Sequence, residues 1–337
     1  MSYRPPLVFP NMSPRANLRG PLVAVLLALL AVVAAGADQT EQKVVVQLPY
    51  THQFQFAGLY AAIAQGYFKA EGLEVEMRVG TFDRRPTTEV ETGRVQYGIA
   101  AAGAFVDRLT GSPLVAVAAI FQHSPFVMLV RADSGIATPA DLAGKRIAMS
   151  PTSQYTEMRA MFYVEGLRSG QFTMVPDRWN HNELVTGEAD AISAFITDVP
   201  KDGPAQKMIR PADYGVDFYG DFLFTSETEA REHPERVLAM RRALLRGWDY
   251  ALAHREEVID WILRNTPVAE RTPGKTREAL LAEAEVTAGL VNADLVEIGH
   301  MNAGRWRHMA ELVVAVGQAP SVARLDGFLF TPRAQQT

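Results

Sequence analysis

The hydrophobic pattern of residues 44–79 predicts a strand, a loop, a helix and a second strand in succession. Residues 44–46 are three valines, which is typical of a strand buried on both faces, and Pro49 ends this strand because proline cannot donate to a sheet ladder. Apolar residues then recur at helical spacing until residues 73–79 alternate between apolar and charged side chains, as in a half-exposed strand. This is a βαβ unit, and its loop at 50–56 lies at the carboxyl end of a strand, where open α/β sheets bind ligands.

Two later segments echo each other. Residues 92–100 read TGRVQYGIA and residues 186–194 read TGEADAISA, each predicting a helix that ends at glycine and is followed by a strand. Because βαβ patterns flank both copies, we expect two lobes of the same construction. The alternative is that helix, glycine and strand follow one another in many α/β proteins, so that a short match proves little about duplication.

The predicted lobes are joined by two crossings of the chain, which form a hinge. The apolar runs 115–121 and 126–130 flank the polar bend 122–125, and a helix start is predicted at Thr138, which precedes a proline and an acid. An apolar strand at 221–226 returns the chain to the first lobe. We expect lobe 1 at 43–131 and 225–330, lobe 2 at 132–224, helices at 237–253, 256–263, 275–290 and 301–316 packed on lobe 1, and a mobile tail at 331–337.

The first residues have the pattern of an export signal. Arginines precede the apolar run 21–35, and Ala35-Gly36-Ala37 has the small residues of a signal peptidase site. We therefore expect a signal peptide at 1–37, cleavage after Ala37 and a periplasmic protein. The alternative is an uncleaved N-terminal membrane anchor, although the apolar run is short for a spanning helix.

Composition excludes several classes of function. The 337 residues include no cysteine, which rules out disulfides, thiolate metal sites and cysteine nucleophiles, and the net charge of −5 comes without any basic run suited to nucleic acid. His300 and His308 have no second ligand at metal spacing, and the glycine-rich and serine motifs of nucleotide-binding and hydrolytic enzymes are missing. We expect a monomer with no cofactor, no metal and no nucleic-acid partner.

The first loop carries the main candidates for ligand binding. Aromatic and hydrogen-bonding side chains before a helix suit stacking on a flat ligand and holding its polar edge. We expect Tyr50 and His52 to face the site and Phe56 to face the core. The alternative is that Phe54 and Phe56 both pack the helix start into the core. The candidates in this loop are Tyr50, Thr51, His52 and Phe54.

Other candidates lie on the equivalent loops. The turn at 150–153 precedes a helix and suits either an anionic group or simple capping of that helix. Asp198 suits an amine or a ring N–H, or is a solvated acid before Pro200. The candidates outside the first loop are Ala101, His123, Ser124, Thr152, Ser153, Trp179, Asn180, Thr197 and Asp198.

Four segments together resemble a known family. GLYAAIAQGYFKAEGLEVE, TGRVQYGIA, SGIATPADLAGKRIAMSPTS and TGEADAISAF resemble, in this order, the SsuA/THI5-like (NMT1) group of type II periplasmic solute-binding proteins. The resemblance implies a small organic ligand captured by hinge closure and passed to the membrane subunits of an ABC importer. The ligands that it implies are thiamine pyrimidine precursors, sulfonates, nitrate-like anions and aromatic acids.

The resemblance also brings in two alternatives. One is a thiamine pyrimidine synthase, which would need a lysine, a histidine and a cysteine-rich run where this chain has Ala100, Ala104 and residues 215–219. None of those groups is present, and similarity of fold does not transfer chemistry. The other is a ligand-sensing module of a signalling receptor, because the C-terminal segment IGHMNAGRWRHMAELVVAVGQAP resembles the end of such periplasmic modules, which are followed by an output domain.

Overall fold

The computed structural model describes residues 1, 41–81, 83–149, 153–178, 182–198 and 204–331. The apolar run and the Ala37 site of the predicted signal peptide lie outside the described residues, as does the predicted tail after Thr331. The helices and strands of the described residues lie within one compact unit that begins at Gln42. Within the described part of the chain, no helix combines the length and the apolarity needed to cross a membrane.

Among the described residues, five strands form the first sheet, in the order β2-β1-β3-β10-β4. Strand β1 is parallel to β2 and β3, whereas β10 is antiparallel to both β3 and β4. We call this sheet and the helices packed on it the first lobe. Its strands are β1 Gln42–Gln47, β2 Leu73–Arg78, β3 Tyr97–Ala100, β4 Leu114–Ala119 and β10 Phe222–Ser226.

The second sheet repeats this plan, in the order β7-β6-β8-β5-β9, with β5 as its antiparallel strand. The echoed segments at 92–100 and 186–194 lead into β3 and β8, which hold the same place in their two sheets, so the predicted likeness of the lobes is confirmed. We call this sheet and its helices the second lobe. Its strands are β5 Phe126–Arg131, β6 Arg146–Ala148, β7 Thr173–Val175, β8 Ala191–Phe195 and β9 Gln206–Ile209.

Two segments cross between the sheets. The first crossing, residues 120–125, follows β4, and the second crossing, residues 210–221, precedes β10. The strands of the second sheet therefore come from one continuous stretch, residues 126–209, whereas the first sheet receives its antiparallel strand β10 after the second crossing. The lobe boundaries predicted at 131 and 224 were wrong by one strand and part of another, because β5 pairs with β8 and β9, and all of β10 pairs with β3 and β4.

Helices cover the sheets, and the four long C-terminal helices that the sequence predicts are all present. In place of the helix predicted after Thr138 there is one 3-10 turn, Pro139–Leu142. The shorter helices of the first lobe are α2 Ala57–Ala64, α3 Tyr67–Ala70, α4 Pro86–Glu91, α5 Ala102–Thr110 and α8 Glu227–Glu232. Its long helices are α9 Pro234–Ala253, α10 Arg255–Asn265, α11 Arg277–Val291 and α12 Ala303–Ala315. The second lobe has α6 Ser153–Val164 and α7 Asn182–Thr186.

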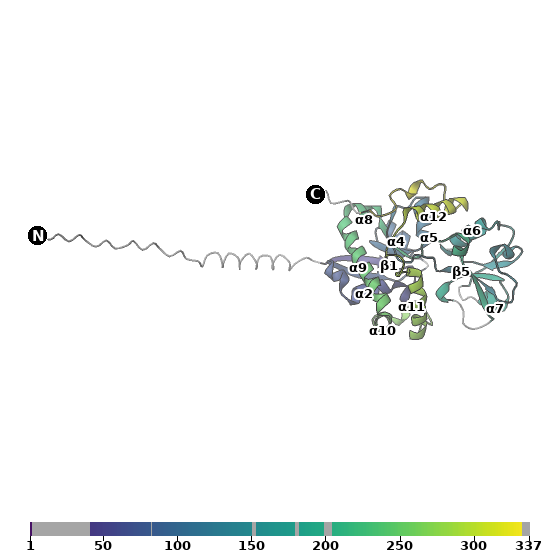
Figure 1. The fold of residues 1–337 in the computed structure, drawn as a ribbon, viewed down its shortest axis with the longest axis horizontal. Helices are drawn as coiled ribbons and strands as arrows, with labels where there is room; N and C mark the ends of the chain where they lie inside the picture. The colour runs from purple at the N-terminus through teal and green to yellow at the C-terminus, as the bar shows by residue number, and fades with distance from the viewer. Residues whose placement is uncertain (2–40, 82, 150–152, 179–181, 199–203, 332–337) are drawn as a thin grey trace. The chain divides into compact units, whose positions relative to one another are not determined.

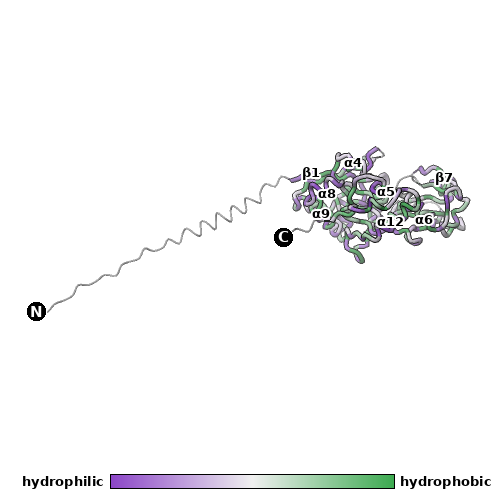
Figure 2. The backbone as a smooth tube through the Cα atoms, turned by 90° about the horizontal axis from the view of Figure 1, so that it is seen from above, coloured by the Kyte–Doolittle hydropathy of each residue, from purple (hydrophilic) through white to green (hydrophobic). Residues whose placement is uncertain are grey.

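Helix α6 joins the second lobe to the first through apolar contacts. It packs against α5 and α12 of the first lobe, and the three helices lie side by side in Figures 1 and 2. Met158, Met161 and Phe162 on α6 are buried in the core cluster that also holds the aromatic side chains of the first lobe. A smaller cluster covers the other face of the second sheet. The hinge residues lie beside this shared core.

Candidate functional site

Several chain segments meet at one edge of the first sheet. Strands β1, β3 and β4 run in the same direction and β10 runs against them, so the ends of the first three meet the start of the fourth. This edge, which we call the carboxyl edge, comprises residues 48–56, Ala101, residues 120–124 and Asp221. Both crossings reach the carboxyl edge. A ligand held between two hinged lobes would lie at this edge.

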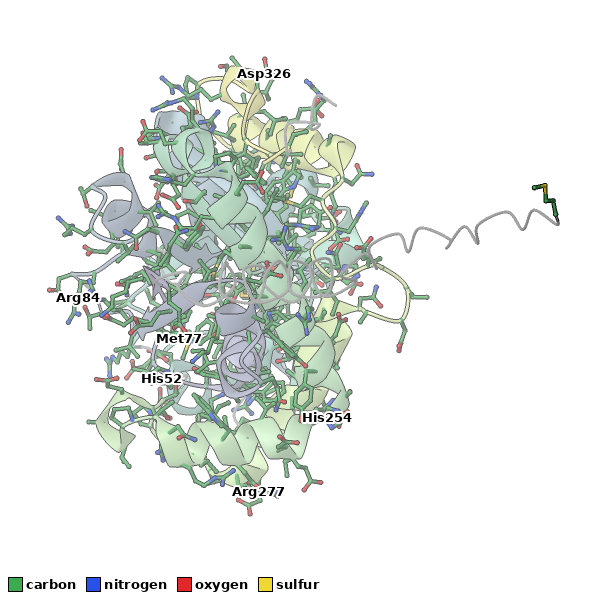
Figure 3. The ribbon with its side chains drawn as sticks, turned by 90° about the vertical axis from the view of Figure 1, so that its left-hand side faces the viewer. His52, Met77, Arg84, His254, Arg277 and Asp326 are labelled. Atoms are coloured by element: carbon green, nitrogen blue, oxygen red, sulfur yellow. The ribbon has the colours of Figure 1, made fainter. Side chains whose placement is uncertain are left out.

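The loop after β1 is tied to a distant segment of the chain. His52 N–H donates to the Glu270 carbonyl over 2.7 Å, and Thr272 N–H donates to the His52 carbonyl over 3.2 Å. The His52 side chain, labelled in Figure 3, is 5% exposed; its Nδ1 lies 3.0 Å from the Tyr60 hydroxyl and its Nε2 3.5 Å from Glu270 Oε2. Burial lowers the pKa of His52, against the raising effect of the Glu270 carboxylate. His52 thus anchors the loop.

Polar side chains continue from this loop into the start of β10. Gln53 Nε2 donates to Gln55 Oε1 over 2.5 Å, and Gln55 Nε2 donates to Asp221 Oδ2 over 2.6 Å. The backbone N–H of Gln55 donates to Glu283 Oε1 over 2.8 Å, and Glu283 pairs with Lys275 at 3.0 Å. Buried amides and carboxylates therefore hold the loop in place by hydrogen bonds.

Asp221 is a buried acid in an apolar setting. Its side chain, with Gln55, borders a cavity of about 10 Å³ whose other walls are apolar, including Ile120 and Trp248. A cavity of this size holds about one water molecule. Burial raises the pKa of Asp221 to about 7, although the hydrogen bond from Gln55 favours the charged form.

A charged cluster links the two crossings. His123 Nδ1, in the first crossing, lies 2.9 Å from Asp217 Oδ1, in the second. Arg305 of α12 donates to the carbonyls of Gln122 in the first crossing and of Asp217 and Phe218 in the second, and its guanidinium lies 2.9 Å from Asp217 Oδ1. One side chain of the first lobe thus binds both hinge segments.

A second buried acid lies next to this cluster. Glu157 of α6 is 0% exposed, and within the described residues neither carboxylate oxygen has a partner in hydrogen-bonding geometry. Burial raises the pKa of Glu157 to about 8, while the nearby Ser124 hydroxyl favours the charged carboxylate and lowers this pKa. The negative Asp217 raises this pKa further, and Arg305 lowers it. Glu157 therefore keeps its proton near neutral pH.

The structure brings only part of the predicted set together. Tyr50 and Thr51 are half-buried at the carboxyl edge, Ala101 caps α5 there, and His123 and Ser124 lie in the first crossing. Thr197 is half-buried in a 3-10 turn that contacts α11. The side chains of Thr152, Ser153, Trp179, Asn180 and Asp198 lie outside what the structure describes.

Two predicted ligand contacts point into the protein. The outward orientation expected of His52 was wrong, because the loop does not continue the alternation of a strand. It turns at residues 54–56 into a 3-10 helix that buries Phe54 (0% exposed) and Phe56 (2% exposed). The prediction that Phe56 faces the core is confirmed.

Sequence reasoning missed the residues that hold this loop. Gln53 and Gln55 alternate with phenylalanines in the segment QFQF, and Asp221 directly precedes the apolar strand Phe222–Ser226. Those two patterns were the available signals. Thr272 and Glu283 lie more than 200 residues away along the chain and have no local pattern that would relate them to the loop.

The NMT1/THI5 like family model matches residues 53–258, more than half of the chain, and the chain belongs to this family. It is 25% identical over 259 residues to the formylaminopyrimidine-binding protein of Halalkalibacterium halodurans, covering 72% of this chain and 78% of that protein. It is 23% identical over 303 residues to the riboflavin-binding protein RibY of Chloroflexus aurantiacus, covering 85% of this chain and 84% of that protein.

Solved structures confirm the two-lobed α/β fold of type II periplasmic binding proteins. The fold is similar to that of the periplasmic aliphatic sulphonate binding protein SsuA from Escherichia coli, with a TM-score of 0.67 at 14% identity. The match covers 88% of this chain and 94% of that one. At this level of identity the similarity concerns the fold and not the ligand.

Proposed function

We propose that this protein is a periplasmic solute-binding protein that captures a small organic ligand at the carboxyl edge and presents it to the membrane subunits of an ABC importer. The observation that carries the proposal is the meeting of the polar loop 48–56 with both crossings at one edge of the first sheet. A ligand placed there contacts the segments on which the lobes hinge. Such a ligand favours the closed state by its higher affinity for that state.

The ligand that we propose is a flat nitrogen heterocycle, with a thiamine pyrimidine precursor as the first candidate. The curated relatives are named for a formylaminopyrimidine and for riboflavin. Among the described residues near the carboxyl edge, the cations Arg271, Lys275 and Arg305 are engaged by a backbone carbonyl, by Glu283 and by the crossings respectively, while Asp221 adds a buried acid. This charge balance supports a neutral or basic ring over a sulfonate.

A binding screen tests the proposal. Formylaminopyrimidine, riboflavin and an alkanesulfonate are each added to the mature protein, and the shift in melting temperature is followed by calorimetric titration of every compound that stabilises it. We expect a heterocycle to stabilise the protein and the sulfonate to have little effect. Stabilisation by the sulfonate alone would contradict the proposed ligand class, and stabilisation by none of the three would count against the pyrimidine assignment.

Export is part of the proposal. The arginine-flanked apolar run and the Ala35-Gly36-Ala37 site support a signal peptide that is cleaved after Ala37. N-terminal sequencing of protein recovered from the periplasm should begin at residue 38. Recovery of a membrane-bound chain that retains Met1 would support the anchor alternative.

A synthase activity has less support. Ala100 ends β3 and Ala104 is buried in α5, and neither methyl group can form a Schiff base or donate an imidazole. We expect no pyrimidine product when the purified protein is given pyridoxal phosphate and iron. One equivalent of hydroxymethylpyrimidine phosphate per chain would overturn the binding assignment.

One contact favours a sensor role as the second candidate. Arg305 lies on α12, the last long helix of the described chain, and binds both crossings, so hinge movement would reach the C-terminal part of the chain. Deletion of the gene separates the two roles. Loss of ligand uptake supports the importer, whereas normal uptake with a lost transcriptional response to the ligand supports the sensor.

A further inference from the structure

A continuous hydrogen-bonded relay connects Asp221 to the hydroxyl group of Thr51. Asp221 Oδ2 accepts from Gln55 Nε2 over 2.6 Å, and Gln55 Oε1 accepts from Gln53 Nε2 over 2.5 Å. Gln53 Oε1 accepts from the Thr272 hydroxyl over 3.2 Å, and the Thr272 and Thr51 hydroxyl oxygens are 2.7 Å apart. Asp221, Gln53 and Gln55 are each less than a tenth exposed, whereas Thr51 is half-buried.

The relay has a direction that the buried acid sets. Above about pH 7, where Asp221 is ionised, its carboxylate can only accept, so Gln55 must turn its amide nitrogen toward Asp221 and its carbonyl toward Gln53. Gln53 then has its carbonyl toward Thr272, whose single hydroxyl hydrogen is spent on that bond. The hydrogen of the last bond must therefore come from Thr51.

We propose that Asp221, through this relay, fixes the Thr51 hydroxyl as a hydrogen-bond acceptor at the carboxyl edge, and that Thr51 selects ligands with an N–H or O–H donor. The inference rests on the proposed function and adds to it the polarity of one contact. An exocyclic amino group on a heterocycle has the donor that Thr51 requires. A ring that offers only acceptors at this position leaves a partly buried oxygen unpaired, which lowers its affinity.

The direction of the relay can be tested without any ligand. In Gln53→Glu, the second carboxylate oxygen faces the carbonyl of Gln55, and Gln55 cannot turn around because its nitrogen is held by Asp221. We therefore expect the urea midpoint of Gln53→Glu to fall at pH 8.5. In the double variant with Asp221→Asn, the asparagine can donate to a reversed Gln55, and the midpoint should recover.

A second double variant separates polarity from charge. Combined with Gln53→Glu, Asp221→Leu also removes the negative charge near the carboxylate introduced at position 53, but leucine has no hydrogen to donate to Gln55. We expect a clearly smaller recovery with Leu than with Asn. Equal recovery with both, or recovery with neither, would overturn the fixed direction of the relay.

The selectivity is tested with two matched probes, 4-amino-2-methylpyrimidine and 4-methoxy-2-methylpyrimidine. The amino group has an N–H donor, and the methoxy group has none. We expect the native protein to bind the amino compound about tenfold more tightly, as one hydrogen bond allows. Thr51→Val, which keeps the shape of the side chain, should abolish the preference. Thr110→Val, an exposed position on α5, is the control and should retain it.

The two failures can be told apart. If the native protein binds the amino probe but Thr51→Val keeps the preference, the role of Thr51 is wrong and the proposed function stands. If the native protein binds neither probe at millimolar concentration, the proposed ligand class and the selectivity at Thr51 both fail. The urea series still decides the direction of the relay in that case.

Discussion

At the scale of single residues, the most informative side chains are two carboxylic acids that the fold removes from water. Asp221 lies under the candidate binding loop, and Glu157 lies beside the crossings. The pKa of Asp221 is raised to about 7 and that of Glu157 to about 8, both mainly by burial. Because the folded chain binds these protons more tightly than the unfolded chain, both groups make stability decrease as pH rises.

Replacing Glu157 by Gln should flatten this pH dependence. The pKa of Glu157 rises from an ordinary value of 4.5 to about 8, so its contribution to stability is complete below about pH 4.5 and is lost as pH rises toward 8. The slope from one proton is at most about 1.4 kcal/mol per pH unit. Urea unfolding of both proteins between pH 5 and 9 measures how the free energy of unfolding changes with pH.

Part of the slope below about pH 7 should persist in Glu157→Gln, because Asp221 still titrates there. Glu311→Gln on exposed α12 surface controls for the loss of a carboxylate. A slope above pH 7 that is identical in Glu157→Gln and the native protein would contradict the buried, protonated state of Glu157.

Two aromatic residues of the binding loop should separate affinity from stability. Tyr50 is half-buried at the carboxyl edge, so Tyr50→Ala should weaken ligand binding by about 1–3 kcal/mol with a smaller effect on unfolding. Phe56 is 2% exposed, and Phe56→Ala should cost about 3–5 kcal/mol of stability. Calorimetric titration and urea unfolding decide this. Unchanged affinity in Tyr50→Ala would move the site away from this loop.

At the scale of elements, the sequence predicted the helices and most strands because their periodicity is local. It also predicted the likeness of β3 and β8 from two short echoes. It did not predict the course of residues 50–56, because a 3-10 turn has neither the period of a strand nor that of a helix. The orientation of His52 depends on Glu270 and Tyr60, which no local pattern connects to it.

The contact between α2 and α9 depends on a glycine. A Cβ atom at Gly247 of α9 would lie 2.0 Å from the Gly58 carbonyl oxygen and 2.9 Å from the Ala62 Cβ, both on α2. Gly247→Ala should therefore push the helices apart and destabilise the protein by about 1–3 kcal/mol or more. Thermal or urea unfolding measures the effect.

Gly289 of α11 is the matched control for that substitution. A Cβ atom there would meet nothing within 4 Å, so Gly289→Ala should stabilise the protein by about 0.5–1 kcal/mol through helix propensity alone. Equal effects of the two substitutions would show that the close approach of α2 and α9 is not needed for stability.

At the scale of the whole molecule, the sequence predicted two lobes and a hinge but placed the first crossing one strand too late and the second crossing part of a strand too late. Strands β4 and β5 are both continuous apolar runs, and hydrophobicity cannot tell which sheet an apolar strand joins. The polar bend at 122–125 was the correct signal, because the first crossing lies there, whereas the predicted boundary fell at residue 131. The hydrogen bonds from Arg305 to both crossings, which we call the clamp, depend on tertiary contacts and had no signal in the sequence.

Arg305 should control how freely the lobes move. It binds carbonyls of both crossings from α12, so it fixes the hinge segments to the first lobe and leaves the second lobe to rotate about them. Arg305→Met keeps much of the apolar stem but removes the guanidinium, and with it every one of these hydrogen bonds and the contact with the Tyr219 ring. We expect a wider range of lobe positions without ligand, and weaker binding because less of the closed geometry is preorganised.

Spin labels can measure this range directly, because a chain without cysteine accepts two introduced cysteines as unique labelling sites. Ser169→Cys in the second lobe and Ala253→Cys on α9 of the first are both exposed positions. The distance distribution between them should be broader in Arg305→Met than in the native protein, and the stabilising heterocycle should narrow it in both. Arg307→Met, exposed on the same helix, is the control for loss of a positive charge. Identical distributions in Arg305→Met and Arg307→Met would mean that the crossings hold their geometry without the clamp.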